Sequence, residues 1–169
     1  MTVSLFTFVD MYARVLGSAD HLLARGVSHA EEAGGSGEDV LDWRLIDDMH
    51  PVRFQLQTLC NFAQEWPARA IGIPAPKGVD LKQDVAGFRA ALSSAQAFLA
   101  DLRPEQFEGR DDVQLPYNIA PGMEPVLPAG QWLSVFATTN IYFHLMAAYA
   151  ILRAKGVPLG KADLFSAGI

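Results

Sequence analysis

The stretch QWLSVFATTNIYFHLMAAYAILRAKGVPLG, residues 131–160, is the longest nearly unbroken apolar segment of the chain. Its apolar residues recur at helical spacing, and Lys155, Gly156 and Pro158 form a strong helix stop signal. We therefore predict a helix from about Ala129 to Lys155. Because this helix is apolar nearly all round, we expect it to be covered on more than one side, by its own bundle and by a second copy of the chain.

A membrane span is the alternative for this helix, because it is about as long as the ~20 residues that a bilayer requires. Thr138, Thr139, Asn140 and His144 lie near its middle, where an unpaired polar group in lipid is costly. We therefore expect a buried helix of a soluble bundle and no membrane partner. The first residues of the chain lack the basic region of a signal peptide, which predicts a cytoplasmic location.

The composition is that of a globular domain. Half of the 169 residues are hydrophobic, so residues 1–169 are predicted to form a single domain with its own core. The formal net charge is -6 and no Lys/Arg cluster is present, which argues against a nucleic-acid partner. Cys60 is the single cysteine, which excludes an internal disulfide. It falls on an apolar stripe and is expected to be a structural thiol.

Two helices are predicted in the first half of the chain. Residues 3–25 place apolar side chains at alternating spacings of three and four, as in an amphipathic helix. Residues 47–70 show the same period, with Asp47 or Asp48 accepting hydrogen bonds from the first turn. Pro67 is expected to bend or end this second helix.

A third helix is predicted from Asp80 to Leu102, with Gln83 completing a variant of the capping box. The connections before it are irregular. Residues 29–39 are rich in glycine and read as a flexible link, and residues 71–79 form a proline-rich loop.

Between the third and last helices, residues 113–119 and 123–128 are predicted to be two short strands around the turn Ala120-Pro121-Gly122. Their prolines restrict them to edge pairing. The expected fold is therefore all-α, a four-helix bundle with a short irregular or β-hairpin insertion before the last helix. The C-terminal residues 159–169 have no period and are expected to pack across the bundle.

The candidate site begins with Asn140 and His144, which lie one helical turn apart within an apolar stripe. Burying either without a partner costs roughly 1–3 kcal/mol, so each must bond to something. They bond each other, a backbone carbonyl or a water, or they face a polar cavity or metal that His50 reaches from the second helix. Gln57 and Asn61 share the polar line of His50, so the predicted ligand pocket comprises His50, Gln57, Asn61, Asn140 and His144.

Two side chains at i and i+4 plus a histidine from another helix can hold a divalent ion such as zinc or nickel. The ligands would be His50, His144 and Asn140, although Asn is a poor ligand for zinc. The chain contains no GxSxG, HExxH or Ser/His/Asp arrangement, so the sequence does not decide whether the protein is an enzyme. His21 and His29 are expected to be solvated.

The runs NIYFHLMAAYAILRAKGVPLGKADLF (residues 140–165) and IDDMHPVRFQLQTLCNFA (residues 46–63) resemble a bacterial family of unknown function in the DinB-like superfamily. The resemblance covers essentially the whole chain. It implies that superfamily's four-helix bundle, which commonly forms dimers.

Better understood members of the superfamily look like metal-dependent enzymes, some of which handle low-molecular-weight thiols. They carry one histidine near the start of the second helix and an H-x-x-x-H pair on the fourth. By position His50 matches the first and His144 one of the pair, while Asn140 or Ala148 occupies the remaining place.

Two functions are consistent with these residues. The first is a DinB-like homodimer that binds a small molecule in a polar pocket around His50, Asn140 and His144. The alternative is a divalent-metal-dependent hydrolase or thiol transferase that uses His50 and His144 as ligands. A bound metal would lower the pKa of its water and supply a nucleophile near neutral pH. The sequence names neither substrate nor reaction.

Overall fold

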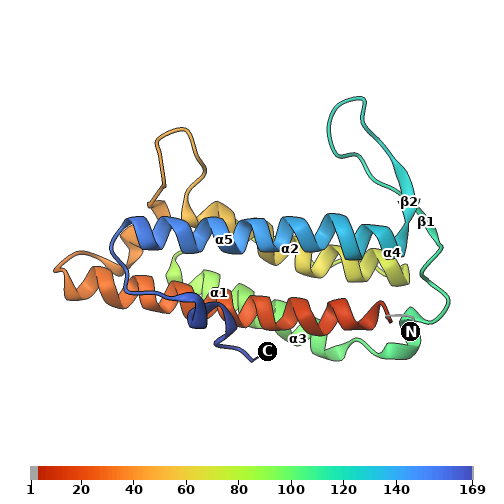
Figure 1. Ribbon diagram of the computed structural model, residues 1–169, viewed down its shortest axis with the longest axis horizontal. Helices are drawn as coiled ribbons and strands as arrows, with labels where there is room; N and C mark the ends of the chain where they lie inside the picture. The colour runs from red at the N-terminus through yellow and green to blue at the C-terminus, as the bar shows by residue number, and fades with distance from the viewer. Residues whose placement is uncertain (1–3, 169) are drawn as a thin grey trace.

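The structure, a computed structural model that describes residues 4–168, is a bundle of four long helices (Figure 1). The last long helix is continuous but changes its winding along its length. In chain order the helices are α1 (Phe6–Glu32), α2 (Val52–Ile71), α3 (Val85–Asp101) and a final helix composed of α4 (Ala129–Gln131), a π-helical segment (Trp132–Ala137) and α5 (Thr138–Ala154). The predicted all-α bundle is confirmed.

The helices run in the order up, down, down, up. Between α1 and α3, Gln96 Nε2 donates to the Ala13 carbonyl at 3.1 Å, and Arg89 pairs with Asp20 at 2.8 Å, which makes these helices antiparallel. Figure 1 shows α1 beside α5 and α2 behind them, with α1 and α5 running in the same direction.

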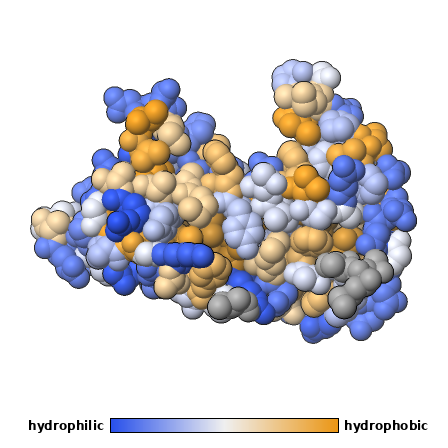
Figure 2. All heavy atoms as spheres, in the orientation of Figure 1, coloured by the Kyte–Doolittle hydropathy of each residue, from blue (hydrophilic) through white to orange (hydrophobic). Residues whose placement is uncertain are grey.

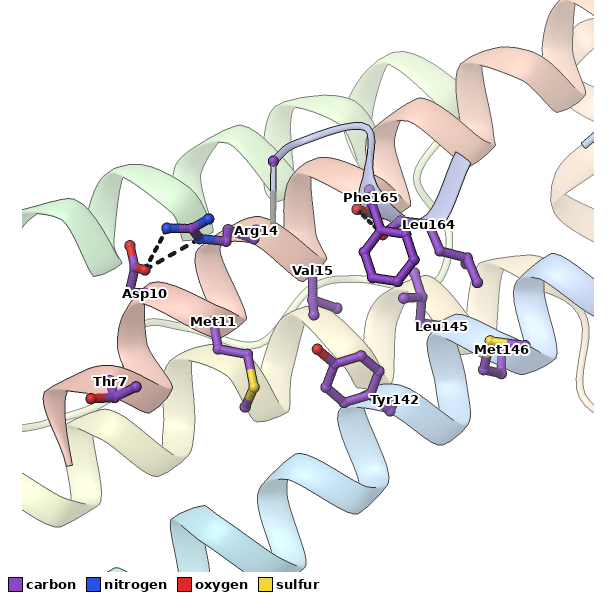
Figure 3. A pocket seen from close by; sticks show the side chains of 12 residues that line it. Thr7, Asp10, Met11, Arg14, Val15, Tyr142, Leu145, Met146, Leu164 and Phe165 are labelled. Atoms are coloured by element: carbon purple, nitrogen blue, oxygen red, sulfur yellow. Dashed lines mark hydrogen bonds and ion pairs between the residues drawn. The ribbon is translucent and has the colours of Figure 1, made fainter. Parts of the chain in front are cut away.

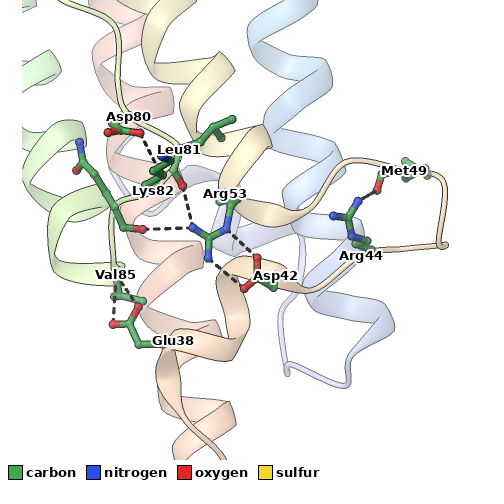
Figure 4. A network of polar contacts seen from close by, with 10 residues as sticks. Glu38, Asp42, Arg44, Met49, Arg53, Asp80, Leu81, Lys82 and Val85 are labelled. Atoms are coloured by element: carbon green, nitrogen blue, oxygen red, sulfur yellow. Dashed lines mark hydrogen bonds and ion pairs between the residues drawn. The ribbon is translucent and has the colours of Figure 1, made fainter.

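Because α2 and α3 are parallel, residues 72–84 must return along the whole of α2. Gly72 turns the chain at the end of α2 with a φ of 78°. At the other end, Arg53 donates to the Leu81 carbonyl at 2.8 Å and pairs with Asp42 at 2.8 Å (Figure 4). The proline-rich loop is therefore a crossover held along its length.

The predicted end of the first helix is wrong. α1 continues to Glu32, so residues 29–32 are helical and not part of a flexible link. Ala30 is 5% exposed, so the last turn of α1 packs on the core. This packing stabilises the turn as helix although its sequence shows no helical periodicity. The chain leaves the helix only at Gly34, whose φ is 81°, and then forms a 3₁₀ helix, Gly37–Asp42.

The start of α2 is also later than predicted. Pro51 is the N-cap residue and Asp47 and Asp48 lie exposed in the preceding loop. Pro67 does not end α2. It lies inside the helix and is buried. Packing of Pro67 and its neighbour Trp66 outweighs the one backbone hydrogen bond that proline removes.

The start of α3 is displaced from Asp80 to Val85. Asp84 is the true N-cap, and its Oδ1 accepts from the Gly87 amide at 2.8 Å. Asp80 instead accepts from the Lys82 amide at 2.9 Å within the crossover. Both aspartates precede apolar residues at helical spacing, so the sequence did not distinguish a capped turn from a capped helix.

The β-hairpin is confirmed. β1 (Gln114–Pro116) pairs antiparallel with β2 (Val126–Pro128), and Leu115 faces Leu127. Figure 1 shows this hairpin and the loop of residues 43–51 projecting from the same side of the bundle, at its two ends.

The final segment also packs as expected. Residues Lys161–Phe165 form a 3₁₀ helix on α1, where the Ser18 hydroxyl donates to the Leu164 carbonyl at 2.8 Å. The predicted stop at Gly156 is confirmed by its φ of 89°.

The helix Ala129–Ala154 is, by length and composition, apolar enough to cross a membrane, and 33% of its most apolar window is buried. Its inner face packs closely on α1. A Cβ added at Gly26 would lie 2.8 Å from Leu152 Cδ2, so the absence of a side chain at Gly26 lets the two helices pack this closely. The outer face is left uncovered by the described part of the chain.

Candidate functional site

The candidate residues lie along the interface between α2 and α5, which we call the α2–α5 seam. The two helices pair antiparallel, because the Trp66 ring stacks on Trp132 with centroids 4.8 Å apart while His144 Nδ1 lies 2.7 Å from Gln55 Oε1. His144 is therefore opposite the start of α2, where His50 also lies. The seam ends in a histidine pair.

Hydrogen bonding determines which nitrogen of His144 carries the proton. Gln55 Nε2 donates to the His50 carbonyl at 3.0 Å, so its Oε1 is the atom that faces His144. An amide oxygen only accepts, so His144 Nδ1 must be the donor. In the neutral ring, Nε2 then keeps its lone pair.

Burial lowers the pKa of His144, and the nearby His50 lowers it further. The imidazole is 9% exposed and is neutral at pH 7. Its free Nε2 can therefore accept a proton or a hydrogen bond, or ligate a metal.

Aromatic rings surround this pair. The His50 ring stacks on Phe54 with centroids 3.8 Å apart, and Phe54 meets His144 edge-on at 6.1 Å. Phe143 also meets His144 edge-on, with ring centroids 5.2 Å apart. His50 is exposed whereas His144 is buried, so one histidine lies at the surface and the other behind it.

Asn140 does not join the histidines. Its Nδ2 donates to the Phe136 carbonyl of its own helix at 2.8 Å. It lines a separate hollow of about 250 Å³ beneath the hairpin, with Leu127 and Val135. A short amide can bond the carbonyl four residues earlier, so it needs no partner from another helix.

Gln57 and Asn61 are engaged elsewhere as well. Gln57 Nε2 donates to the Val79 carbonyl at 2.7 Å, and the Val79 amide donates to Asn61 Oδ1 at 2.9 Å. They hold the crossover against α2. The structure thus divides the predicted five-residue pocket among three places and keeps only His50 and His144 together.

A three-ligand metal site is not completed by these residues. Within residues 4–168, no cluster of three His, Cys, Asp or Glu side chains is arranged to hold a metal ion. His50 and His144 supply two nitrogen ligands, but the Asn140 amide points to its own helix. The Gln55–His144 bond nevertheless fixes the His144 tautomer through an acceptor oxygen, as the outer contacts of metal-ligating histidines do.

Cys60 is a structural thiol, as predicted. It is buried, and its Sγ lies 3.6 Å from the Ala91 carbonyl. Burial raises its pKa to about 12, so the thiolate is absent near neutral pH.

A cavity that the sequence did not indicate lies between α1 and α5, under the C-terminal segment (Figure 3). Its volume is about 410 Å³ and its lining is mostly apolar, including Met11, Tyr142 and Met146. His21 Nε2, expected to be solvated, lies 2.8 Å from Asp163 Oδ1 and helps to fasten this segment to α1. The cavity depends on an aperiodic tail, which carries no sequence signal for its position.

The arrangement is that of a DinB-like helical bundle with a hairpin insertion. The crystal structure of a DinB family member protein from Shewanella denitrificans matches with a TM-score of 0.86 and 26% sequence identity, covering 95% of this chain and 90% of that one. The chain belongs to the family described as Domain of unknown function (DUF1993), which it matches over residues 6–165. No curated protein matches significantly.

Proposed function

We propose that this protein binds a small molecule at the His50–His144 end of the α2–α5 seam and acts as a homodimer. The observation that carries the binding proposal is the Gln55 contact, which fixes the tautomer of the neutral His144 ring and leaves its Nε2 lone pair free. A buried nitrogen held in one tautomer is a specific acceptor for a ligand N–H or O–H group.

The chemistry of the ligand follows from the rings around the acceptor. Phe54 and Phe143 provide aromatic surface, and His50 stacks on Phe54 at the exposed side. A small molecule with a hydrogen-bond donor beside a flat apolar part satisfies both features. Aromatic alcohols, amines and thiols belong to this class.

The binding proposal is tested by thermal shift and two-dimensional NMR, using phenol, aniline and thiophenol as probes. We expect ring resonances of His50 and His144 to shift on binding. His50→Ala changes an exposed residue and should weaken binding without unfolding the protein, whereas His29→Ala should not. Binding that is unchanged in both His50→Ala and His144→Gln, or no binding of any probe, would contradict the proposal.

A divalent metal at the same two histidines is the second candidate, favoured by the outer contact from Gln55 to His144. It would supply the water activation of a hydrolase or thiol transferase. Elemental analysis for zinc, nickel, manganese and iron should use protein purified without a histidine tag. If the small-molecule proposal is right, the analysis should find no metal in a stoichiometric amount. A stoichiometric metal that is lost in His144→Ala would establish the metal site instead.

The homodimer proposal rests on a concave apolar surface. It consists of the outer face of α5, the loop of residues 43–51 and the hairpin, and Figure 2 shows apolar atoms on both projections and along the helix between them. Seven of the eleven exposed large hydrophobic side chains of the described chain lie there, so the patch is concentrated. They are Leu45, Ile46, Ile119, Met123, Val126, Val135 and Phe143.

A second copy fits this surface by symmetry. The helix is about 39 Å long at 1.5 Å per residue, with the hairpin at one end and the loop at the other. A two-fold axis across the middle of α5 would place the hairpin of each copy against the loop of its partner. The same operation would cover Phe143 beside the histidine pair.

Sedimentation equilibrium tests the homodimer. We expect a dimer at micromolar concentration, and Val135→Glu, a change at a side chain that is 57% exposed, should shift it toward monomer. Phe165→Glu lies outside the surface and serves as the matched control. A stable monomeric wild-type protein would contradict the proposal. The cytoplasmic location stays a prediction.

A further inference from the structure

A second polar hollow lies on the far half of α2, away from the histidine pair. Its volume is about 420 Å³, and it is bounded by α2 and by the first part of the crossover, including Pro74 and Pro76. Gly72 turns the chain back over the helix, and the two hydrogen bonds of Val79 anchor it again. The walls of the hollow are therefore held at both ends.

Gln64 contributes an acceptor without a partner. The residue is 7% exposed, and its Nε2 donates to the Cys60 carbonyl at 3.2 Å. Its Oε1 accepts no hydrogen bond from any residue of the described chain, and Gln64 lines the hollow. That oxygen is not among the buried unpartnered atoms of the described chain, so it is open to the hollow, where a ligand can donate to it.

Glu65 lines the same hollow and brings a carboxylate to it. Its closest cation is Arg69 Nη1 at 3.8 Å, which is beyond hydrogen-bond length, and no described residue donates to it. Burial raises the pKa of Glu65, with Arg69 acting in the opposite direction. The carboxylate is thus half-buried and lacks donors.

The remaining polar groups favour a ligand that donates. Arg69 Nη2 donates to the Pro116 carbonyl at 2.6 Å, the guanidinium lies over the Trp66 and Tyr117 rings, and Arg69 Nε has no partner but is buried, so it is not exposed to a ligand in the hollow. Besides Arg69, Asn61 Nδ2 is the one side-chain donor at the hollow that no described residue accepts from, since Gln64 Nε2 already donates to Cys60. Pro74 and Pro76 have no N–H to offer, but their rings provide apolar surface.

We propose that this hollow is a binding site for a small primary amine, whose ammonium group donates to the Glu65 carboxylate and to Gln64 Oε1 while its carbon chain lies on Pro74 and Pro76. An ammonium has three donors and no acceptor, which matches this set of oxygens. A carboxylate ligand meets repulsion from Glu65, and an alcohol brings no charge to pair with it. The site is separate from the His50–His144 pair and independent of its function.

The test uses n-butylamine, n-butanol and butyrate as probes of equal chain length, in calorimetric and NMR titrations at pH 7.5 and low salt. We expect n-butylamine to bind and to shift the side-chain amide resonances of Asn61 and Gln64. Glu65→Gln should weaken its binding at least tenfold. Glu105→Gln, which changes an exposed carboxylate outside the hollow, should leave it unchanged.

Three results would overturn the proposal: n-butanol binding as tightly as n-butylamine, amine binding unchanged in Glu65→Gln, or no amine binding up to 10 mM, a limit of about 3 kcal/mol in binding free energy. Thermal unfolding of each variant separates loss of binding from loss of fold. His50→Ala should leave amine binding intact, because the two sites do not share residues.

Discussion

The two ends of the α2–α5 seam use the same antiparallel pairing for different purposes. At one end Trp66, Trp132, Tyr117 and Phe136 form a closed aromatic cluster, with ring centroids 4.8–6.0 Å apart. At the other end the rings are fewer, and His144 lies behind an exposed His50. Stacked aromatics bury area in all directions and leave no free acceptor. The histidine end leaves one nitrogen available, which is why we place ligand binding there.

The aromatic end nevertheless contains two unpaired donors. Trp66 Nε1 and Arg69 Nε are buried without a hydrogen-bond partner in the described chain. The Arg69 guanidinium lies 5.5 Å from the Trp66 ring and 5.0 Å from the Tyr117 ring, and cation–π attraction offsets part of that cost. The aromatic end is therefore stabilised by buried apolar area, and the histidine end by specific hydrogen bonds.

The largest effect should come from emptying the aromatic end. Trp66→Ala is expected to lower the free energy of unfolding by about 3–5 kcal/mol, because the cavity cannot collapse between stacked rings. Trp66→Phe keeps a ring, removes the unpaired N–H and should cost clearly less. Urea unfolding monitored by circular dichroism measures both. Equal losses for the two variants would contradict the view that packed area stabilises this end.

Removing the central hydrogen bond of the histidine end should have a smaller effect. Gln55→Leu leaves the His144 Nδ1–H and the His50 carbonyl without their partner and is expected to cost roughly 1–3 kcal/mol. Gln57→Leu removes one bond from a half-buried residue, so it should cost less and serves as the control. A larger loss in Gln57→Leu than in Gln55→Leu would contradict the proposed role of Gln55.

Acidification should weaken the same end. The pKa of His144 is lowered in the folded protein, so the unfolded chain binds its proton first and stability falls as the pH drops below about 6.5. In His144→Gln this part of the pH dependence should disappear. Asp163, whose pKa is also lowered, loses its contribution only below its ordinary value of 3.8, in a separate range. Unfolding measured from pH 8 to 4.5 checks the first effect.

The smallest effect is expected at Asn140. Its amide bonds its own helix, so Asn140→Ala should change stability by less than about 0.5 kcal/mol and leave binding at the histidine pair unchanged. The same titrations with phenol provide the measurement. A loss of binding comparable to that of His50→Ala would contradict this expectation and show that Asn140 contributes to the binding site.

Much of the fold followed from periodicity. The last helix, its Gly156 stop and the hairpin lie where the spacing of apolar, glycine and proline residues predicts them. The predicted helix boundaries were wrong where one residue type is compatible with two local structures. Asp80 caps a turn instead of a helix, and Pro67 is tolerated because packing compensates for its missing N–H.

The candidate site was predicted only in part. His50 and His144 share an end because α2 and α5 are antiparallel, an arrangement that follows from the crossover between the parallel helices α2 and α3. Asn140, Gln57 and Asn61 went elsewhere because short polar side chains bond whichever backbone group is nearest. The Gln55 contact was missed, since an isolated glutamine in an amphipathic helix usually faces water.

The sequence by itself determined the all-α class, the four helical segments and the central place of residues 131–160, because hydrophobic periodicity acts locally along the chain. Only the tertiary structure decided that α2 and α3 run parallel, with a crossover held by Val79, and that Gln55 sets the tautomer of His144. These choices depend on which polar groups lack partners once the helices have packed, and that is a property of the assembled bundle.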